Sequence, residues 1–280
     1  MAQGKSNTSY VVFLSIVAAL GGILFGYDTG VISGTTATVS DQFALNDISK
    51  GWYVGCALIG SIIGVACAGM LSDYLGRKLT MLISATLFSV SAIGCCVCVG
   101  FQDLVIYRII GGVGIGIVSI VSPIYISEIS PARIRGTMVS LYQLAITMGL
   151  LLSYLVNYII LKNSATVSFT GYFQTIFVSE YWRGMLGSET LIALFFFIII
   201  FFIPESPKWL IVKGRDNRAM QVFQRLMASA DDSRSEFIAT KASIAGEVRS
   251  EWSALKDPAI VKAVIIGAAI AILGQFMGVN

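Results

Sequence analysis

Residues 10–34 read YVVFLSIVAALGGILFGYDTGVISG, an apolar stretch that carries a single charge at Asp28. As a helix, a stretch of this length spans the roughly 30 Å hydrocarbon core of a bilayer. It is too long and too rich in glycine for the apolar region of a signal peptide, and no small-residue cleavage site follows it. The stretch therefore predicts a membrane-spanning helix with a carboxylate inside it.

Six further apolar runs follow the first along the chain: 51–72, 79–101, 104–126, 138–160, 187–203 and 259–280. Of all residues, 56% are hydrophobic and only 12% are charged, and the mean hydropathy is +0.80. Because this balance is far from that of a soluble domain, we expect an all-α membrane protein inserted as a multi-pass bundle. Seven helices are predicted, the last of them cut short at residue 280.

Basic residues are distributed unequally between alternate short loops. One side carries Lys5, Arg77, Lys78, Arg133 and Arg135, and the other carries Lys50, Lys162 and Arg183. Since Lys and Arg favour cytoplasmic loops, the amino terminus is predicted to be cytoplasmic in a cell inner (plasma) membrane. Charge arranged by loop does not form a nucleic-acid-binding patch, so no nucleic-acid partner is expected.

Residues 204–258 form the only polar segment of any length. Apolar residues at helical spacing (Ala219, Val222, Phe223, Leu226, Met227) follow Asp216. Residues 229–232 can cap a second helix that continues through Ile244 and Val248. Each apolar stripe is too small to enclose a core, so a helical linker is favoured over a separate binding module.

No enzyme chemistry is visible in the sequence. The chain has no histidine, and its five cysteines (Cys56, Cys67, Cys95, Cys96, Cys98) fall in apolar runs, so we expect core packing and no metal site. No nucleophile has a base nearby. The stretch GGVGIG at 111–116 lies within a membrane helix and follows no strand, which argues against a nucleotide loop. No cofactor is expected.

Glycines repeat at intervals of four within three of the runs. They are Gly22, Gly26, Gly30 and Gly34 in the first run, Gly60 and Gly64 in the second, and Gly112 and Gly116 in the fourth. Small faces of this kind allow the backbones of neighbouring membrane helices to approach closely.

Asp28 and Arg108 are predicted to lie at similar depth in the bilayer. Asp28 is six residues from the outer end of the first run, and Arg108 is about four residues from the outer start of the fourth. A buried charge costs several kcal/mol unless it is paired, so each makes the other plausible. One interpretation is a fixed ion pair between two helices. The other, favoured here, is a titratable carboxylate whose proton affinity depends on Arg108. The first and fourth helices open successive triplets, an arrangement common in transporters.

Four further motifs make a resemblance specific: GMLSDYLGRK at 69–78, YISEISPARIRG at 125–136, PESPKWL at 204–210 and GQFMGVN at 274–280. With GGILFGYDTGVISG, they resemble the sugar porter family of the major facilitator superfamily, most closely bacterial sugar–proton symporters of the xylose, galactose and arabinose type. The resemblance implies a twelve-helix fold of two six-helix bundles around a central sugar site. On this basis residues 1–203 are the amino-terminal bundle, 204–258 a cytoplasmic linker and 259–280 the start of helix 7, and we expect the sequence to be partial.

The resemblance also implies roles for single residues. Asp28 resembles the proton-coupling aspartate and Arg108 its partner, whereas facilitative relatives carry a neutral residue in place of the aspartate. Phe25 and Gln143 resemble residues that line the sugar site, although Phe25 could be ordinary packing and Gln143 could bond a neighbouring helix. Gln275 and Asn280 match polar positions of the helix 7 motif. Gly274 and Leu150 depart from the xylose-type pattern, so pentose and hexose stay open.

Five charged residues in these motifs resemble the family's inner-gate network: Asp73, Arg77, Glu128, Arg135 and Glu205. All lie at predicted cytoplasmic helix ends, where an alternative role is simply to fix topology.

The resemblance implies proton-coupled import of a monosaccharide by alternating access, in a protein that is functional as a monomer at full length. A facilitative uniporter is the nearest alternative, and Asp28 argues against it. A membrane sugar sensor is a more distant one, because 204–258 offers only a short linker.

Overall fold

The computed structural model describes residues 7–164, 171, 174–246 and 258–276. Its helices are α1 (Thr8–Gln42), α2 (Asp47–Leu75), α3 (Arg77–Val97), α4 (Phe101–Ile129), α5 (Arg135–Ser164), the short π-helix η1 (Thr175–Ser179), α7 (Tyr181–Gly187), α8 (Glu189–Ile200), α9 (Pro207–Val212), α10 (Asp216–Leu226), α11 (Ala230–Gly246) and α12 (Pro258–Phe276). The chain forms two compact units, Met1–Phe237 and Ile238–Asn280, and the helical bundle belongs to the first.

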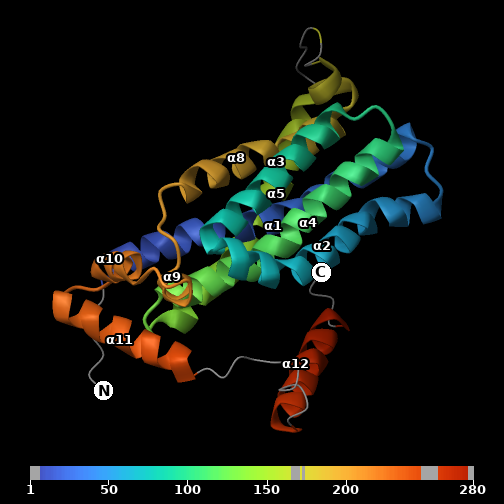
Figure 1. The fold of residues 1–280 in the computed structure, drawn as a ribbon. Coiled ribbons are helices and arrows are strands. Elements are labelled where there is room, and N and C mark those ends of the chain that lie inside the picture. The colour runs from blue at the N-terminus through green and yellow to red at the C-terminus, as the bar shows by residue number, and fades with distance from the viewer. Residues whose placement is uncertain (1–6, 165–170, 172–173, 247–257, 277–280) are drawn as a thin grey trace. The chain divides into compact units, whose positions relative to one another are not determined.

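Six helical segments of the described chain are long and apolar enough to cross a membrane: α1 to α5, and α7 with α8 as one segment over Tyr181–Ile200. They confirm the all-α membrane fold and the first six predicted spans. In the second unit α12 carries a shorter apolar stretch, Ile260–Ala269, so the seventh span stays a prediction. Figure 1 shows α1 to α5 and α8 running alongside one another.

The predicted glycine faces are confirmed as the contacts between helices. α2 packs along α4, where a Cβ added to Gly60 would lie 2.1 Å from Ile109 O and one added to Gly112 would lie 2.1 Å from Ala57 O. α1 packs along α5 in the same way, and a Cβ on Gly26 would lie 1.9 Å from Ile146 O. Only glycine permits such backbone proximity, so the spacing of these residues fixes which helices pair.

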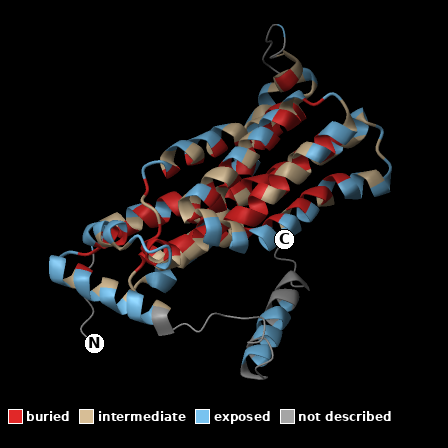
Figure 2. Ribbon diagram, in the orientation of Figure 1, coloured by how far each residue is buried: buried red, intermediate tan, exposed pale blue. Residues whose placement is uncertain are grey.

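Burial follows this pairing. The faces of α1 and α4 that meet other helices are buried, as Figure 2 shows. The outward face of α1 is exposed, whereas α4 is exposed only near its start and is otherwise buried or half-buried. α4 is the most enclosed of the six spans: 61% of the residues in its apolar stretch are buried, against 22% for α5. Side chains carried on α1 and α4 can therefore reach the interior of the bundle.

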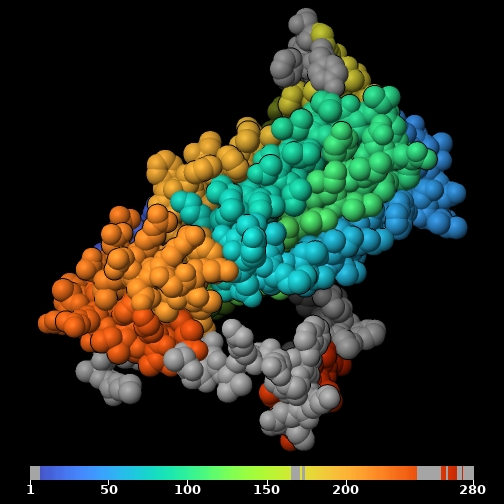
Figure 3. Space-filling view, in the orientation of Figure 1, coloured from blue at the N-terminus to red at the C-terminus, as the bar shows by residue number. Residues whose placement is uncertain are grey.

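Residues 204–237 gather at one end of the bundle, hereafter the linker end, as the orange atoms of Figure 3 show. Ser206 accepts a hydrogen bond from Trp209 N and caps α9, with Pro207 as the first helical residue. α10 buries Ala219, Val222, Phe223 and Leu226, which confirms the predicted amphipathic helix.

The second predicted linker helix is α11. Ser229 Oγ accepts from Asp232 N at 3.1 Å, as expected for a capping residue at its start. The helix includes Ile244, whereas Val248 lies outside the described residues.

Candidate functional site: buried charges in the helical bundle

Asp28 and Arg108 form a buried ion pair between α1 and α4. Arg108 Nη1 donates to Asp28 Oδ1, and the two residues are only 6% and 3% exposed. Gly26 and Gly30, on either side of Asp28, let α1 lie close to α5, and Gly112 brings α4 against α2 one turn after Arg108. The predicted contact is confirmed, because helix packing brings the two side chains together.

Glu189 is a third buried charge that the sequence analysis did not single out. It begins α8, is 4% exposed, and interacts electrostatically with both Asp28 and Arg108. Its Oε1 has no hydrogen-bond partner among the described residues, and neither has Arg108 Nε. An acid at the start of the apolar run 187–203 was the available signal. Nothing in the sequence indicates that this end of the run faces Asp28.

Two tyrosine hydroxyls interact electrostatically with these charges, Tyr27 with Glu189 and Tyr53 with Asp28 and Arg108. Tyr27 OH and Ser188 Oγ are 2.6 Å apart, and Tyr53 OH and Thr35 Oγ1 are 2.8 Å apart. Within each pair the two hydroxyl groups are hydrogen-bonded to each other, and no hydrogen bond from them to Asp28 or Glu189 is present in the described chain. One guanidinium can balance only one of two carboxylates, so the arrangement suits a site that holds a proton.

The predicted sugar-site residues of the bundle lie on the paired helices α1 and α5. Phe25 is half-buried on α1, one residue before Gly26, which meets the backbone of Ile146 on α5. Gln143 lies one turn before Ile146 and is exposed. Helix pairing thus brings Phe25 and Gln143 to a similar level, with the amide of Gln143 free to meet a ligand from outside the bundle.

The other predicted sugar-site residues cannot be placed beside them. Gln275 lies in α12, in the second unit, and only its backbone is described. Asn280 lies outside the described residues. Leu150 is half-buried on α5, where its side chain approaches Gly30.

A cluster of charges lies at the linker end. Arg77 donates through Nε and Nη2 to the two carboxylate oxygens of Glu128, each at 3.0 Å, and through Nη1 to Asp73 at 3.1 Å. Ser206 Oγ donates to Glu128 at 2.5 Å. The bidentate ion pair therefore joins the start of α3 to the last turn of α4. The hydrogen bond from Ser206 adds the start of α9 to this junction.

Glu205 and Arg135 belong to this end but not to that ion pair. Glu205 Oε1 accepts hydrogen bonds from the backbone amides of Arg77, Lys78 and Ser206 at 2.9, 3.1 and 2.9 Å, so it caps α3. Burial raises the pKa of the Glu205 carboxyl, and the amide donors oppose this rise. Arg135 donates to Ser130 O at 3.3 Å and forms no ion pair with a described residue.

Comparison with known proteins matches these features to one family. Residues 14–280 match the family model described as "Sugar (and other) transporter". The chain is 36% identical to the D-xylose-proton symporter of Escherichia coli over 98% of its own length and 59% of the relative's. It is 35% identical to the arabinose-proton symporter of Bacillus subtilis over 98% of its own length and 57% of the relative's. The chain thus spans a little over half the length of these curated relatives.

Solved structures agree with the sequence comparison. An inward-open structure of the xylose transporter of Escherichia coli is 34% identical, with a TM-score of 0.78 over 97% of this chain and 62% of the other. A second structure, the proton:xylose symporter bound to 6-bromo-6-deoxy-D-glucose, gives a TM-score of 0.77 at 35% identity over 85% and 54% of the two chains. With its family match, its helical fold and its relatives in agreement, the chain belongs to the sugar porter family of the major facilitator superfamily.

Proposed function

We propose that this bundle is part of a secondary active transporter that couples import of a monosaccharide to protons by alternating access. The observation that carries the proposal is the buried group of Asp28, Arg108 and Glu189, in which two carboxylates face one guanidinium. Relatives named as arabinose-, galactose- and xylose-proton symporters support it. We place the protein in the inner (plasma) membrane, with its amino terminus and linker end in the cytoplasm, on the strength of the loop charges.

Proton coupling follows from the alternatives open to Asp28. Beside Arg108 the carboxylate is balanced as an anion, and when Arg108 moves away a bound proton neutralises it. Glu189 is a second carboxylate with which Arg108 can form an ion pair. When Arg108 separates from Asp28, its guanidinium can therefore still be balanced by a negative charge. A conformational change that moves Arg108 between the acids would then bind or release one proton.

Sugar recognition is assigned to Phe25, Gln143, Gln275 and Asn280. The amide of Gln143 both donates and accepts hydrogen bonds, as a sugar hydroxyl does, and its exposure leaves it available. An aromatic ring such as Phe25 offers an apolar face to the sugar. The proposal covers pentoses and hexoses alike.

The charge cluster of Asp73, Arg77 and Glu128 is assigned to the inner gate, together with Glu205 and Arg135. The bidentate pair of Arg77 and Glu128 ties α3 to α4 at the linker end, where a gate between the two bundles would close. Glu205 contributes by fixing the start of α3, on which Arg77 lies.

Asp28→Asn tests the proposed coupling, because asparagine keeps the shape of the side chain but cannot titrate. In proteoliposomes that contain the protein, with any segment that follows residue 280 included, an imposed pH gradient should no longer drive sugar accumulation. Sugar binding should persist. If the Asp28→Asn variant accumulates sugar at the wild-type level, Asp28 is only a structural ion-pair partner of Arg108.

A further inference from the structure

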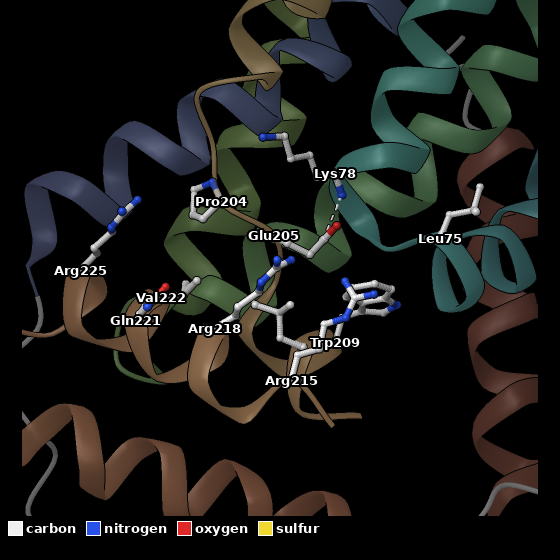
Figure 4. A pocket seen from close by; sticks show the side chains of 11 residues that line it. Leu75, Lys78, Pro204, Glu205, Trp209, Arg215, Arg218, Gln221, Val222 and Arg225 are labelled. Atoms are coloured by element: carbon white, nitrogen blue, oxygen red, sulfur yellow. Dashed lines mark hydrogen bonds between the residues drawn. The ribbon is translucent and has the colours of Figure 1, made fainter. Parts of the chain in front are cut away.

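A cavity of about 420 Å³ at the linker end is lined by eleven residues, of which four are cationic and one is acidic. Lys78 comes from the first turn of α3, and Arg215, Arg218 and Arg225 come from the start and body of α10. Figure 4 shows Lys78 on one side of this cavity and the arginines on the other, with Glu205 between them. The volume is enough for a small organic ligand.

The single acidic side chain that lines the cavity is already engaged. Glu205 accepts three backbone amides on Oε1, and it forms no ion pair with the arginines of α10 in the described chain. Arg218 and Arg225 likewise have no acidic partner among the described residues. The cavity therefore holds an excess of positive charge that its own walls do not balance.

Arg218 and Arg225 lie on the same face of α10. Its apolar face, which includes Val222 and Phe223, is buried against the bundle, so its position is fixed. Arg218 and Arg225 are seven residues apart, which places them about 20° from one another around the helix and roughly 10 Å apart along it. Arg215 lies over the Trp209 ring, 5.5 Å from its centroid, and this contact restrains a third guanidinium.

The cavity lies at the boundary of the membrane-spanning segments. Lys78 Nζ donates to Phe201 O at 2.8 Å, just beyond the last turn of α8, and this is the one acceptor that its ammonium group has among the described residues. Phosphate groups of lipids lie at this level of a bilayer, and soluble phosphate esters reach it from the water. Guanidinium groups bind phosphate through paired N–H donors, so phosphate suits this set of cations.

We propose that the cavity between the start of α3 and α10 is a binding site for an organic phosphate, held by Lys78, Arg215, Arg218 and Arg225. The phosphate belongs either to an anionic lipid headgroup or to a soluble phosphate ester. A bound phosphate would link α10 to α3, and hence to the helix that carries Arg77. The site is separate from the buried charges of the bundle and does not depend on sugar transport.

The test compares two variants that each lose two exposed arginines. Arg218→Gln with Arg225→Gln empties the cavity of two cations, and Arg133→Gln with Arg234→Gln removes the same charge from elsewhere on the surface. Binding of glycerol 3-phosphate is measured by calorimetry in a neutral detergent. Retention of phosphatidylglycerol is measured by native mass spectrometry after incubation with mixed phosphatidylglycerol and phosphatidylcholine.

We expect the wild type and the control variant to bind at least one of these probes, and the cavity variant to bind it roughly tenfold more weakly or worse, as loss of charge-assisted contacts predicts. Selective retention of phosphatidylglycerol identifies a lipid as the source, and calorimetric binding of glycerol 3-phosphate identifies a soluble ester. Equal binding by the cavity and control variants, or binding of neither probe by the wild type, overturns the proposal. Unchanged thermal unfolding of each variant shows that its fold is intact.

Discussion

At the scale of single residues, the pair of Asp28 and Arg108 predicts how substitutions change the free energy of unfolding. Both groups are almost fully buried, so removing one leaves the other without a counter-charge. We expect Arg108→Met to lower the free energy of unfolding by about 3–5 kcal/mol. The double variant Asp28→Asn with Arg108→Met should lose less than the sum of the single variants by at least about 1 kcal/mol. Reversible unfolding in mixed micelles measures all four proteins of the cycle.

Additive losses in this cycle would contradict the pairing. Glu189 sharpens the comparison, because it stays in every variant and interacts with both partners. Coupling that vanishes when Glu189 is also changed to Gln would show that the three side chains act as one group.

Sequence reasoning found the pair at this scale but not its third member. Charges within long apolar runs are conspicuous, and matched depth was enough to place Asp28 beside Arg108. Glu189 stands at the edge of its run, where a charge needs no partner, and only the packing of α8 turns it inward. The sequence predicts Glu205 as one of the charges of the inner gate. Its hydrogen-bond partners are backbone amides, and a pattern of charges in a sequence cannot indicate such partners.

At the scale of elements, the backbone proximity of α1 and α5 predicts a specific intolerance of side chains. Gly26→Ala would place a Cβ 1.9 Å from Ile146 O, so the helices must separate. We expect a loss of about 1–3 kcal/mol in the free energy of unfolding. Gly69→Ala on α2 is the matched control, since no atom lies within 4 Å of its added Cβ. Similar unfolding curves for the two variants would contradict the proposed packing.

The cap of α3 predicts a difference between two substitutions of Glu205. Because burial raises the pKa of this carboxyl, the folded chain binds its proton more tightly than the unfolded chain. The stability that this residue contributes is therefore greatest at low pH and falls as the pH rises through the raised pKa. Glutamine keeps the acceptor oxygen and mimics the neutral form, so Glu205→Gln should gain stability relative to wild type as the pH approaches 7.

Glu205→Ala provides the comparison, because it removes the acceptor for three amides. A loss of about 1–3 kcal/mol is expected at every pH. Thermal unfolding between pH 4 and 8 distinguishes the variants. A glutamine variant as unstable as the alanine variant at pH 7 would show that the cap needs the negative charge.

The elements themselves were largely predictable, since apolar runs and glycine spacing identify the spans and their packing faces. Their ends were not. The first run covers residues 10–34, yet α1 extends from Thr8 to Gln42, because polar residues beyond the hydrocarbon core continue the helix. Ser206 and Pro207 are a recognisable start signal for α9, whose six residues carry too little periodicity to be found by pattern alone.

At the scale of the whole molecule, Arg77 connects segments that are far apart in the sequence. It joins the start of α3 to the end of α4 through Glu128, whose carboxylate also accepts from Ser206 at the start of α9. In the proposed transporter this junction holds the inner gate, while sugar binds near Phe25 and Gln143 in the bundle. A change at the junction should therefore alter how often the gate opens and closes without changing the contacts to sugar.

Arg77→Ala tests this division between gate and binding site. We expect the rate of sugar uptake in proteoliposomes to fall about tenfold, equivalent to ~1.4 kcal/mol in the barrier. The Kd for sugar, measured by calorimetry, should change far less. Arg133→Ala is the matched control, because Arg133 is exposed at the same end and forms no ion pair with a described residue. If sugar binding is lost in Arg77→Ala protein that unfolds at the wild-type temperature, the junction shapes the binding site itself, and gate and site are one structural unit.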